Sequence, residues 1–386
     1  MIPYGKQNIN KDDIESVIDV LNSDFLTQGP VVPKFEDTLS SYCQSEYGVA
    51  VNSATSGLHI ACLALGLQPG DIVWTSPNSF VASANCALYC GATVDFVDID
   101  LSTNNISITA LKEKLQLAEK KGLLPKIIIP VHLSGLPCEM SEIYALSLKY
   151  GFRIIEDASH AIGAKYSIEK NYNVGNCLYS DITVFSFHPV KIITTCEGGL
   201  CVTQNKELSE KMQKLKSHGI VRYEENIFDS ALEKWNYAQE DLGFNYRMTD
   251  LQAALGLSQL KRLDHFINKR NSIAEFYSNH LKGLPIDLPT KKDDILSSYH
   301  LYIIKLKKDC NKSRNDLYKY LVESGIGVNL HYIPIYRHPV YEKLGFRKGY
   351  CIEAETYFEN ALSIPIFPDL SEENLFKVVN SIKKYF

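Results

Sequence analysis

Residues 182–199 read Ile-Thr-Val-Phe-Ser-Phe-His-Pro-Val-Lys-Ile-Ile-Thr-Thr-Cys-Glu-Gly-Gly and combine an apolar run, one lysine and a glycine pair. The run Ile182–Phe187 predicts a buried strand, and Lys191 follows it, ahead of Gly198 and Gly199. A lysine in such surroundings is partly desolvated, which lowers its pKa and frees its amine to attack a carbonyl group. The alternative is a solvated lysine that merely follows a buried strand.

Similar apolar runs precede this stretch, and a helical pattern follows most of them. The other predicted strands are Tyr47–Val51, Ile72–Thr75, Thr93–Val97, Lys126–Val131 and Arg153–Glu156. Helices are predicted at about 58–66, 79–90, 109–121 and 139–150. Strands that alternate with helices predict an α/β fold with a mostly parallel central sheet flanked by helices.

The two ends of the chain follow other patterns. Asn10 caps a predicted helix whose apolar stripe is Ile14, Val17, Ile18 and Leu21. From Thr249 to about Leu281 runs one long amphipathic stretch, broken near Gly256 or Asp264. Beyond it we expect a strand, a helix, a second strand and a closing helix: Tyr299–Leu306, Ser313–Ser324, Val328–His331 and Ser371–Tyr385.

The length of 386 residues exceeds what one hydrophobic core usually serves. We therefore expect a large α/β domain at 1–250, including an N-terminal arm. Residues 251–386 are expected to form an interdomain long helix and a smaller C-terminal α+β domain.

Composition excludes several classes of protein. Hydrophobic residues make up 45%, charged residues 22%, and the net charge is −5, which gives no support for nucleic-acid binding. A signal peptide is not recognisable, and no apolar run approaches the roughly 18 residues of a membrane span, so we expect a cytoplasmic protein without membrane contact. The ten cysteines lack zinc-site spacing, so no metal is expected.

Small polar residues open the helix after the first predicted strand. The segment Asn52-Ser53-Ala54-Thr55-Ser56-Gly57 leaves backbone N–H groups free at a helix start, where the helix dipole favours an anion such as phosphate. Plain N-capping by Ser53 or Thr55 is the alternative. The segment lacks the lysine of a P-loop and the glycine spacing of a dinucleotide fingerprint.

A carboxylate follows the strand at Arg153–Glu156. Asp157 is a loop cap, a metal ligand or the partner of a protonated pyridine nitrogen. Together with the helix start and the Ser186-x-x-x-x-Lys191 unit, it completes the set of groups that would hold pyridoxal phosphate (PLP) at its phosphate, ring nitrogen and aldehyde. Phe80 either stacks on that ring or packs in the core.

Over essentially its full length the chain resembles the DegT-type sugar aminotransferases, which are PLP enzymes of fold type I. The matching motifs are Asn52–Leu58, Ile155–Gly163, Ser186–Gly199, Leu242–Leu260 and Gly327–Pro339. The resemblance implies the PLP-dependent transferase fold type I and a Schiff base between Lys191 and the cofactor.

The resemblance also implies roles for single residues. Lys191 would move the proton, Asp157 would pair with the pyridine nitrogen, and His160 would lie near the phenolic oxygen. The remaining cofactor contacts would come from Thr55, Ser56, Ser186 and Phe80.

Further residues extend the implied site towards the substrate and a second subunit. Asn245 would reach the cofactor phosphate of the neighbouring subunit, which implies a homodimer with shared active sites. His331 and Tyr332 would lie near the sugar nucleotide. Arg247 is a candidate contact of the diphosphate, with a surface ion pair as the alternative.

The implied reaction moves an amino group from L-glutamate, leaving 2-oxoglutarate, to C4 of a UDP-linked 4-keto-6-deoxy-N-acetylhexosamine. Ping-pong kinetics follow from such a scheme. Another nucleotide-sugar C4 or C3 aminotransferase is the alternative, and a non-catalytic sensor of PLP or nucleotide sugars is a more remote one. Related dehydratases carry His in place of the lysine, so Lys191 argues for amino transfer.

One residue departs from the family pattern. Cys196 stands where the family has Gly before Glu197-Gly198-Gly199. A side chain there is expected to crowd the loop after Lys191 or to require a negative φ. Because every group that would bond the cofactor remains, the departure does not predict an inactive protein.

Overall fold

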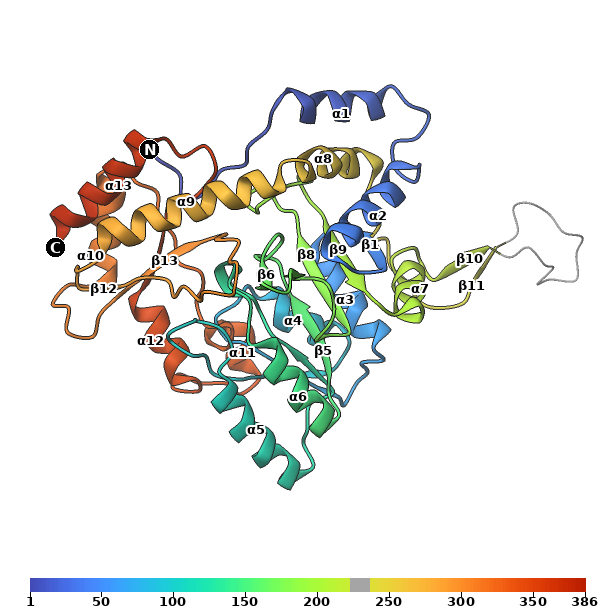
Figure 1. Ribbon diagram of the computed structural model, residues 1–386. Coiled ribbons are helices and arrows are strands. Elements are labelled where there is room, and N and C mark those ends of the chain that lie inside the picture. Colours follow the sequence, from blue (N-terminus) through green and yellow to red (C-terminus); the bar gives the residue numbers. More distant parts are fainter. Residues whose placement is uncertain (223–236) are drawn as a thin grey trace, which may run out of the picture.

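A seven-stranded sheet forms the centre of the computed structural model, which describes residues 1–222 and 237–386 (Figure 1). The strand order is β1-β9-β8-β5-β4-β2-β3. Every strand runs parallel to the others except β9, which pairs antiparallel with β1 and β8. The strands are β1 (Tyr47–Val51), β2 (Ile72–Thr75), β3 (Thr93–Phe96), β4 (Ile127–Ile129), β5 (Arg153–Asp157), β8 (Ile182–Ser186) and β9 (Gly199–Thr203). The predicted α/β fold with a mostly parallel sheet is therefore confirmed.

Helices cover both faces of this sheet because its side chains alternate between two apolar layers. In β4, Ile127 and Ile129 join one buried core, while Ile128 joins another on the opposite face. The first face is covered by α3 (Ala54–Ala64), α4 (Ala82–Tyr89) and α7 (Lys206–Leu215). The opposite face is covered by α2 (Val31–Cys43), α5 (Ile108–Lys121), α6 (Met140–Tyr150) and α8 (Asp250–Leu260).

A second core lies in the C-terminal part of the chain, coloured orange to red in Figure 1. Its antiparallel sheet has the order β12 (Ile286–Asp287), β13 (Tyr302–Leu306) and β14 (Ala361–Ile364). The helices of this part are α9 (Leu263–Leu281), α10 (Arg314–Glu323), α11 (Pro339–Lys343), α12 (Ile352–Asn360) and α13 (Glu372–Tyr385). The N-terminus joins this core, since the N–H of Ile2 donates to the carbonyl of Gly325 at 2.8 Å. The domain boundary at residue 250 stays a prediction.

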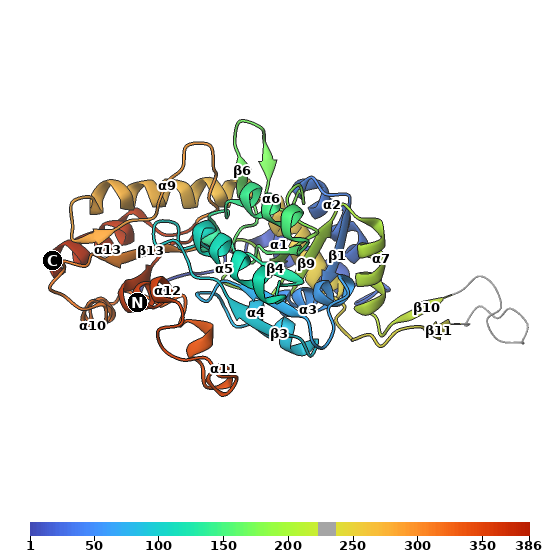
Figure 2. The same cartoon turned by 90° about the horizontal axis from the view of Figure 1, so that it is seen from below.

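Short elements connect these layers. They are β6 (Lys165–Ser167) with β7 (Tyr172–Asn173), β10 (Ile220–Arg222) with β11 (Tyr237–Gln239), and two 3₁₀ turns, η1 (Leu133–Gly135) and η2 (Ile335–Arg337). Figure 2 shows the β10–β11 pair projecting from the body of the molecule. Across the described ranges, none of the helices combines the length and the apolar character that a bilayer crossing needs.

The structure corrects one prediction about the C-terminal elements and decides between the two alternatives of another. The strand predicted at Val328–His331 is absent; Asn329 forms only an isolated bridge with Ser363. The long amphipathic stretch breaks after Leu260, close to Asp264, whereas Gly256 lies inside α8. A glycine is needed at position 256, because the Phe35 ring packs directly on the helix and would lie 2.6 Å from a Cβ atom there.

The first helix, α1 (Lys11–Leu21), begins at the predicted cap but buries a different face. Asn10 accepts a hydrogen bond from the N–H of Asp13 at 3.0 Å, as expected. The buried face, however, carries Asp13, which accepts hydrogen bonds from α8 and from Arg262. The predicted apolar stripe lies largely outside, with exposed fractions of 53%, 46% and 55% at Ile14, Ile18 and Leu21.

Candidate active site

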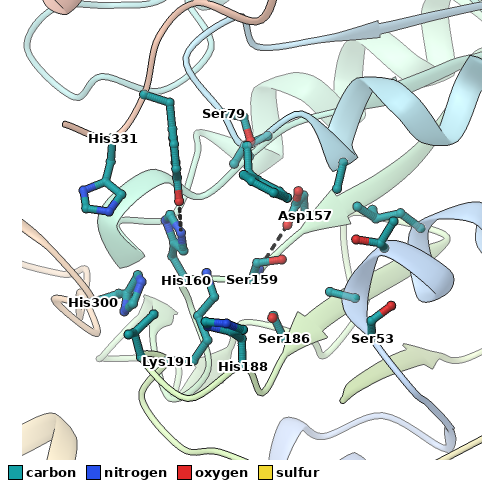
Figure 3. A pocket seen from close by; sticks show the side chains of 18 of the residues that line it. Ser53, Ser79, Asp157, Ser159, His160, Ser186, His188, Lys191, His300 and His331 are labelled. Carbon is teal, nitrogen blue, oxygen red and sulfur yellow. Dashed lines mark hydrogen bonds between the residues drawn. The ribbon is translucent and has the colours of Figure 1, made fainter. Parts of the chain in front are cut away.

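A cavity of about 770 Å³ opens where the parallel strands β5 and β8 end (Figure 3). Its floor comes from the turn before α3 and from the ends of those two strands. Its walls come from the segment before α4 and from residues 329–332 of the C-terminal part. The carboxyl ends of parallel strands are the usual ligand-binding edge of an open α/β sheet.

The start of α3 faces the cavity with small polar residues. Ser53 caps the helix, since its Oγ accepts from the N–H of Ser56 at 3.1 Å, and Ser56 Oγ donates to Asn52 Oδ1 at 2.6 Å. Ser53 therefore does cap the helix. The start of α3 also lines the cavity, so the positive end of the helix dipole would favour an anion there. Gly199 of β9 passes so close that a Cβ atom would lie 2.7 Å from the N atom of Ala54.

Asp157 is the buried acid of the cavity, at the end of β5. Its carboxylate accepts hydrogen bonds from Ser83 Oγ at 2.6 Å and from the N–H of Ser159 at 3.1 Å. Ser83 in turn lies 2.8 Å from Ser79 Oγ. These contacts fix an acceptor oxygen at the bottom of the cavity, where a protonated ring nitrogen would find its partner.

Lys191 lies in the turn after β8, where its backbone N–H donates to the carbonyl of His188 at 2.9 Å. Burial lowers the pKa of its amine to about 8, although the negative charge of Asp157 acts in the opposite direction. This is the desolvated lysine that the sequence predicts. Near neutral pH a useful fraction of its amine is unprotonated and can attack a carbonyl group.

His160 is held as a neutral imidazole beside this lysine. Burial, followed by the positive charge of Lys191, lowers the pKa of His160 well below its usual value. Its Nδ1 accepts from the N–H of Ser134 at 3.2 Å, so the ring proton lies on Nε2, 3.2 Å from the hydroxyl oxygen of Tyr332. His331 is also neutral, since burial and Lys191 lower its pKa to about 3.

Phe80 lies at the surface of the cavity and is 58% exposed. Its ring centre is 6.1 Å from that of Tyr332. The core-packing alternative is therefore excluded, and the ring is free to stack on a bound ligand.

The structure brings most of the predicted site residues together. One cavity is lined by Thr55, Ser56, Phe80, Asp157, His160, Ser186, Lys191, His331 and Tyr332. Asn245 and Arg247 are not among its lining residues. The carbonyl of Asn245 accepts from Asn52 Nδ2 at 3.4 Å, and Arg247 donates to Ser217 Oγ at 3.2 Å. Within the described ranges Arg247 forms no ion pair.

Cys196 corrects the expectation that a side chain here requires a negative φ. The residue keeps the left-handed conformation, with φ of 65°, and is exposed. An L-residue pays about 1–2 kcal/mol for this conformation. The loop after Lys191 therefore retains the backbone path that a glycine would take.

The lining or supporting residues that were not predicted include Tyr4, Ser83 and His300. Ser83 lies near a residue of a quoted motif, since its Oγ is 2.8 Å from that of Ser79, which stands just ahead of α4. Tyr4 and His300 have no sequence signal, since they come to the cavity from the N-terminus and from the segment before β13, both outside the central sheet.

The donor set fits pyridoxal phosphate. An anion site at the start of α3, a buried carboxylate and a desolvated amine lie around one cavity, with an exposed aromatic ring beside them. These would hold the phosphate, the ring nitrogen, the aldehyde and the face of the ring.

Comparison with known proteins gives the same result. The chain matches the DegT/DnrJ/EryC1/StrS aminotransferase family over residues 7–383. The UDP-4-amino-4,6-dideoxy-N-acetyl-beta-L-altrosamine transaminase of Campylobacter jejuni is 39% identical over 392 residues, covering 100% of this chain and 99% of that protein.

Solved structures agree over the same length. Helicobacter pylori PseC, an aminotransferase involved in the biosynthesis of pseudoaminic acid, has a TM-score of 0.90 at 31% identity, covering 100% of this chain and 99% of that one. The PLP-form of the putative sugar aminotransferase Spr1654 of Streptococcus pneumoniae has a TM-score of 0.88 at 29% identity, covering 99% and 98%.

The fold is thus the PLP-dependent transferase fold type I, and the cofactor is pyridoxal 5'-phosphate. The chain belongs to the DegT/DnrJ/EryC1/StrS aminotransferase family and is a sugar aminotransferase.

Proposed function

We propose that this enzyme moves the amino group of L-glutamate to C4 of a UDP-linked 4-keto-6-deoxy-N-acetylhexosamine. This is the reaction of a UDP-4-amino-4,6-dideoxy-N-acetyl-β-L-altrosamine transaminase in pseudaminic acid biosynthesis. The observation that carries the proposal is the 39% identity to such an enzyme across the whole chain. Another nucleotide-sugar C4 or C3 aminotransferase is the competing function.

Different side chains would serve different steps of amino transfer. Bound PLP supplies an aldehyde that captures amines and a ring that accepts an electron pair. Asp157 would keep the ring nitrogen protonated, and the start of α3 with Ser186 would hold the phosphate. The amine of Lys191, once released, would carry the proton between the two carbon atoms that exchange it.

Two neutral imidazoles help Lys191 in this role. His160 and His331 add no positive charge beside the amine, and burial keeps both neutral across the physiological range. Phe80 and Tyr332 would close the cavity over the reacting groups and exclude water.

We further propose that the enzyme is a homodimer with shared active sites. The exposed apolar stripe of α1, formed by Ile14, Ile18 and Leu21, is the kind of surface that a second subunit covers. Asn245 is exposed, and its carbonyl accepts a hydrogen bond from Asn52, which lines the cavity; its side chain would reach the cofactor phosphate of the neighbouring subunit.

The reducing cytoplasm is the proposed location. All ten cysteines are free thiols, and most of them are buried. Persistent free thiols are typical of a reducing compartment.

The substrate assignment is tested by assaying the purified enzyme with L-glutamate and a panel of UDP-linked 4-keto and 3-keto sugars. We expect product from the L-configured 4-keto-6-deoxy-N-acetylhexosamine and release of 2-oxoglutarate. Product from only a D-configured, a 3-keto or a GDP-linked sugar would refute this assignment and leave the family activity intact.

A further inference from the structure

His300 is a buried imidazole in the cavity with no assigned role. It stands just before β13 and is only 4% exposed, yet it lines the same cavity as Lys191 and Asp157. Figure 3 shows it next to Lys191 and His160. Its ring centre lies 4.4 Å from that of His160, with 44° between the planes.

The backbone of His300 is fixed by an arginine from α9. Arg270 is 1% exposed, and its Nη1 donates to the carbonyls of Tyr299 at 3.1 Å, His300 at 3.3 Å and Ile366 at 3.0 Å. Ser298 adds a further contact, because its Oγ donates to the carbonyl of His160 at 2.7 Å. The imidazole of His300 is thus held in place relative to His160 by contacts that do not use its own ring.

The ring nitrogens of His300 are available, unlike those of its buried neighbours. His160 uses Nδ1 and Nε2 with Ser134 and Tyr332, and His331 Nδ1 lies 2.8 Å from Ser363 Oγ. Among the residues that the structure describes, neither nitrogen of His300 has a hydrogen-bond partner, although Nδ1 is buried. Because Nδ1 is shielded from the cavity, Nε2 is the nitrogen that a ligand in the cavity can reach.

The surroundings decide which kind of ligand atom suits this imidazole. Burial, then His160, Lys191 and the Arg270 guanidinium, lower the pKa of His300 well below its usual value. A carboxylate would be held best by a charged imidazolium, which these groups disfavour. A neutral imidazole suits an uncharged oxygen, such as a hydroxyl or a keto oxygen.

We propose that His300 is a further substrate-binding residue, whose imidazole forms a hydrogen bond with a hydroxyl or keto oxygen of the sugar. This inference rests on the proposed function and adds a contact to it. It also assigns a positioning role to the fully buried Arg270, which holds the backbone segment that carries this imidazole.

Two variants of the loaded enzyme test the proposal. His300→Phe keeps a ring against His160 and removes both nitrogens, whereas His300→Gln keeps a donor and an acceptor. With the sugar that the wild type accepts, we expect His300→Phe to lower kcat/KM by about tenfold and His300→Gln to recover most of the loss. The dissociation constant of the aminosugar product, measured by calorimetry, should rise in parallel.

The glutamate half-reaction serves as the control, because it needs no sugar. Its rate, followed through the cofactor absorbance, should stay within about twofold of wild type in both variants. Unchanged kcat/KM and product affinity in His300→Phe would overturn the proposal. An equal loss in the glutamate half-reaction, without rescue by Gln, would overturn it too and assign His300 to packing. A wrong substrate assignment would show separately, because the wild-type enzyme itself would then fail to convert the proposed sugar.

Discussion

The floor and the wall of the cavity come from different parts of the chain. On the floor, Asp157 ends the parallel strand β5, while Ser53 and Lys191 lie in the turns after the parallel strands β1 and β8. On the wall, His300 and Tyr332 come from the C-terminal part, and neither belongs to a strand of the central sheet. Sheet topology alone therefore brings the floor together, whereas the wall depends on packing between the two cores. We expect floor substitutions to damage both half-reactions and wall substitutions to damage the sugar half.

The largest effect is expected at Lys191. Within residues 1–222 and 237–386, Lys191 is the one lysine that lines the cavity, so Lys191→Ala should abolish the visible absorbance of the bound cofactor. Turnover should fall by more than about a thousandfold. Lys206→Ala, at an exposed position of α7, is the matched control and should behave as wild type. A Lys191→Ala protein that retained turnover would remove Lys191 from the floor of the site.

A smaller but still large effect is expected at Asp157. Asp157→Asn keeps the shape of the side chain and removes the charge that would stabilise a protonated ring nitrogen. We expect kcat to fall by about a hundredfold or more in both half-reactions. Ser83→Ala removes one hydrogen bond to Asp157 and keeps the charge, so its loss should be at least tenfold smaller. Stopped-flow absorbance separates the two half-reactions; a loss confined to the sugar half would contradict the division into floor and wall.

On the wall, Tyr332→Phe tests the other side of the comparison. The substitution keeps the ring near Phe80 and removes a hydroxyl that lies 3.2 Å from His160 Nε2. KM for the sugar should rise by about threefold to tenfold, while the rate with glutamate changes little. Steady-state kinetics with each substrate varied in turn gives the answer. Equal losses with both substrates would place Tyr332 with the floor residues.

The smallest effect is expected outside the cavity contacts, at Cys196. Cys196→Gly relieves a left-handed conformation, with φ of 65°, but adds freedom to the unfolded chain. We expect the free energy of unfolding to rise by about 0.5–1 kcal/mol, measured by denaturant titration of the loaded enzyme. Cys196→Ala keeps the Cβ atom and removes only the thiol, so it should bring no gain. A destabilised Cys196→Gly protein would show that the thiol itself contributes a contact.

Much of the central sheet is readable from the sequence because its parallel strands are short apolar runs, each bounded by polar turns. β1 and β2 match their predicted bounds, and the other predicted sheet strands differ by one or two residues at their ends. The strand β9, which pairs antiparallel between β1 and β8, was missed because it begins inside the glycine pair, at Gly199. Val328 and Leu330 alternate with polar Asn329 and His331, and this alternation gave a false strand. Asn329 forms only one isolated bridge, and residues 329–332 line the cavity instead.

The residues of the site also divide into those that a local sequence pattern predicts and those that it does not. Residue type and position at a strand end singled out Asp157 and Lys191, and the Ser-x-x-x-x-Lys spacing added Ser186; all three line the cavity. Tyr4 and His300 could not be predicted, because no local pattern records that the N-terminus and the residues before β13 pack against the sheet edge. The faces of α1 were also misjudged, since Asp13 is buried by hydrogen bonds from Arg262 and α8, a contact that hydrophobic periodicity does not register.

The bond between Lys191 and the cofactor is the central claim, and borohydride reduction followed by peptide mass spectrometry tests it most directly. Reduction of the fully loaded enzyme should fix a pyridoxyl group on Lys191 at close to one per chain. A pyridoxyl group on any other lysine, or none on fully loaded enzyme, would contradict the account.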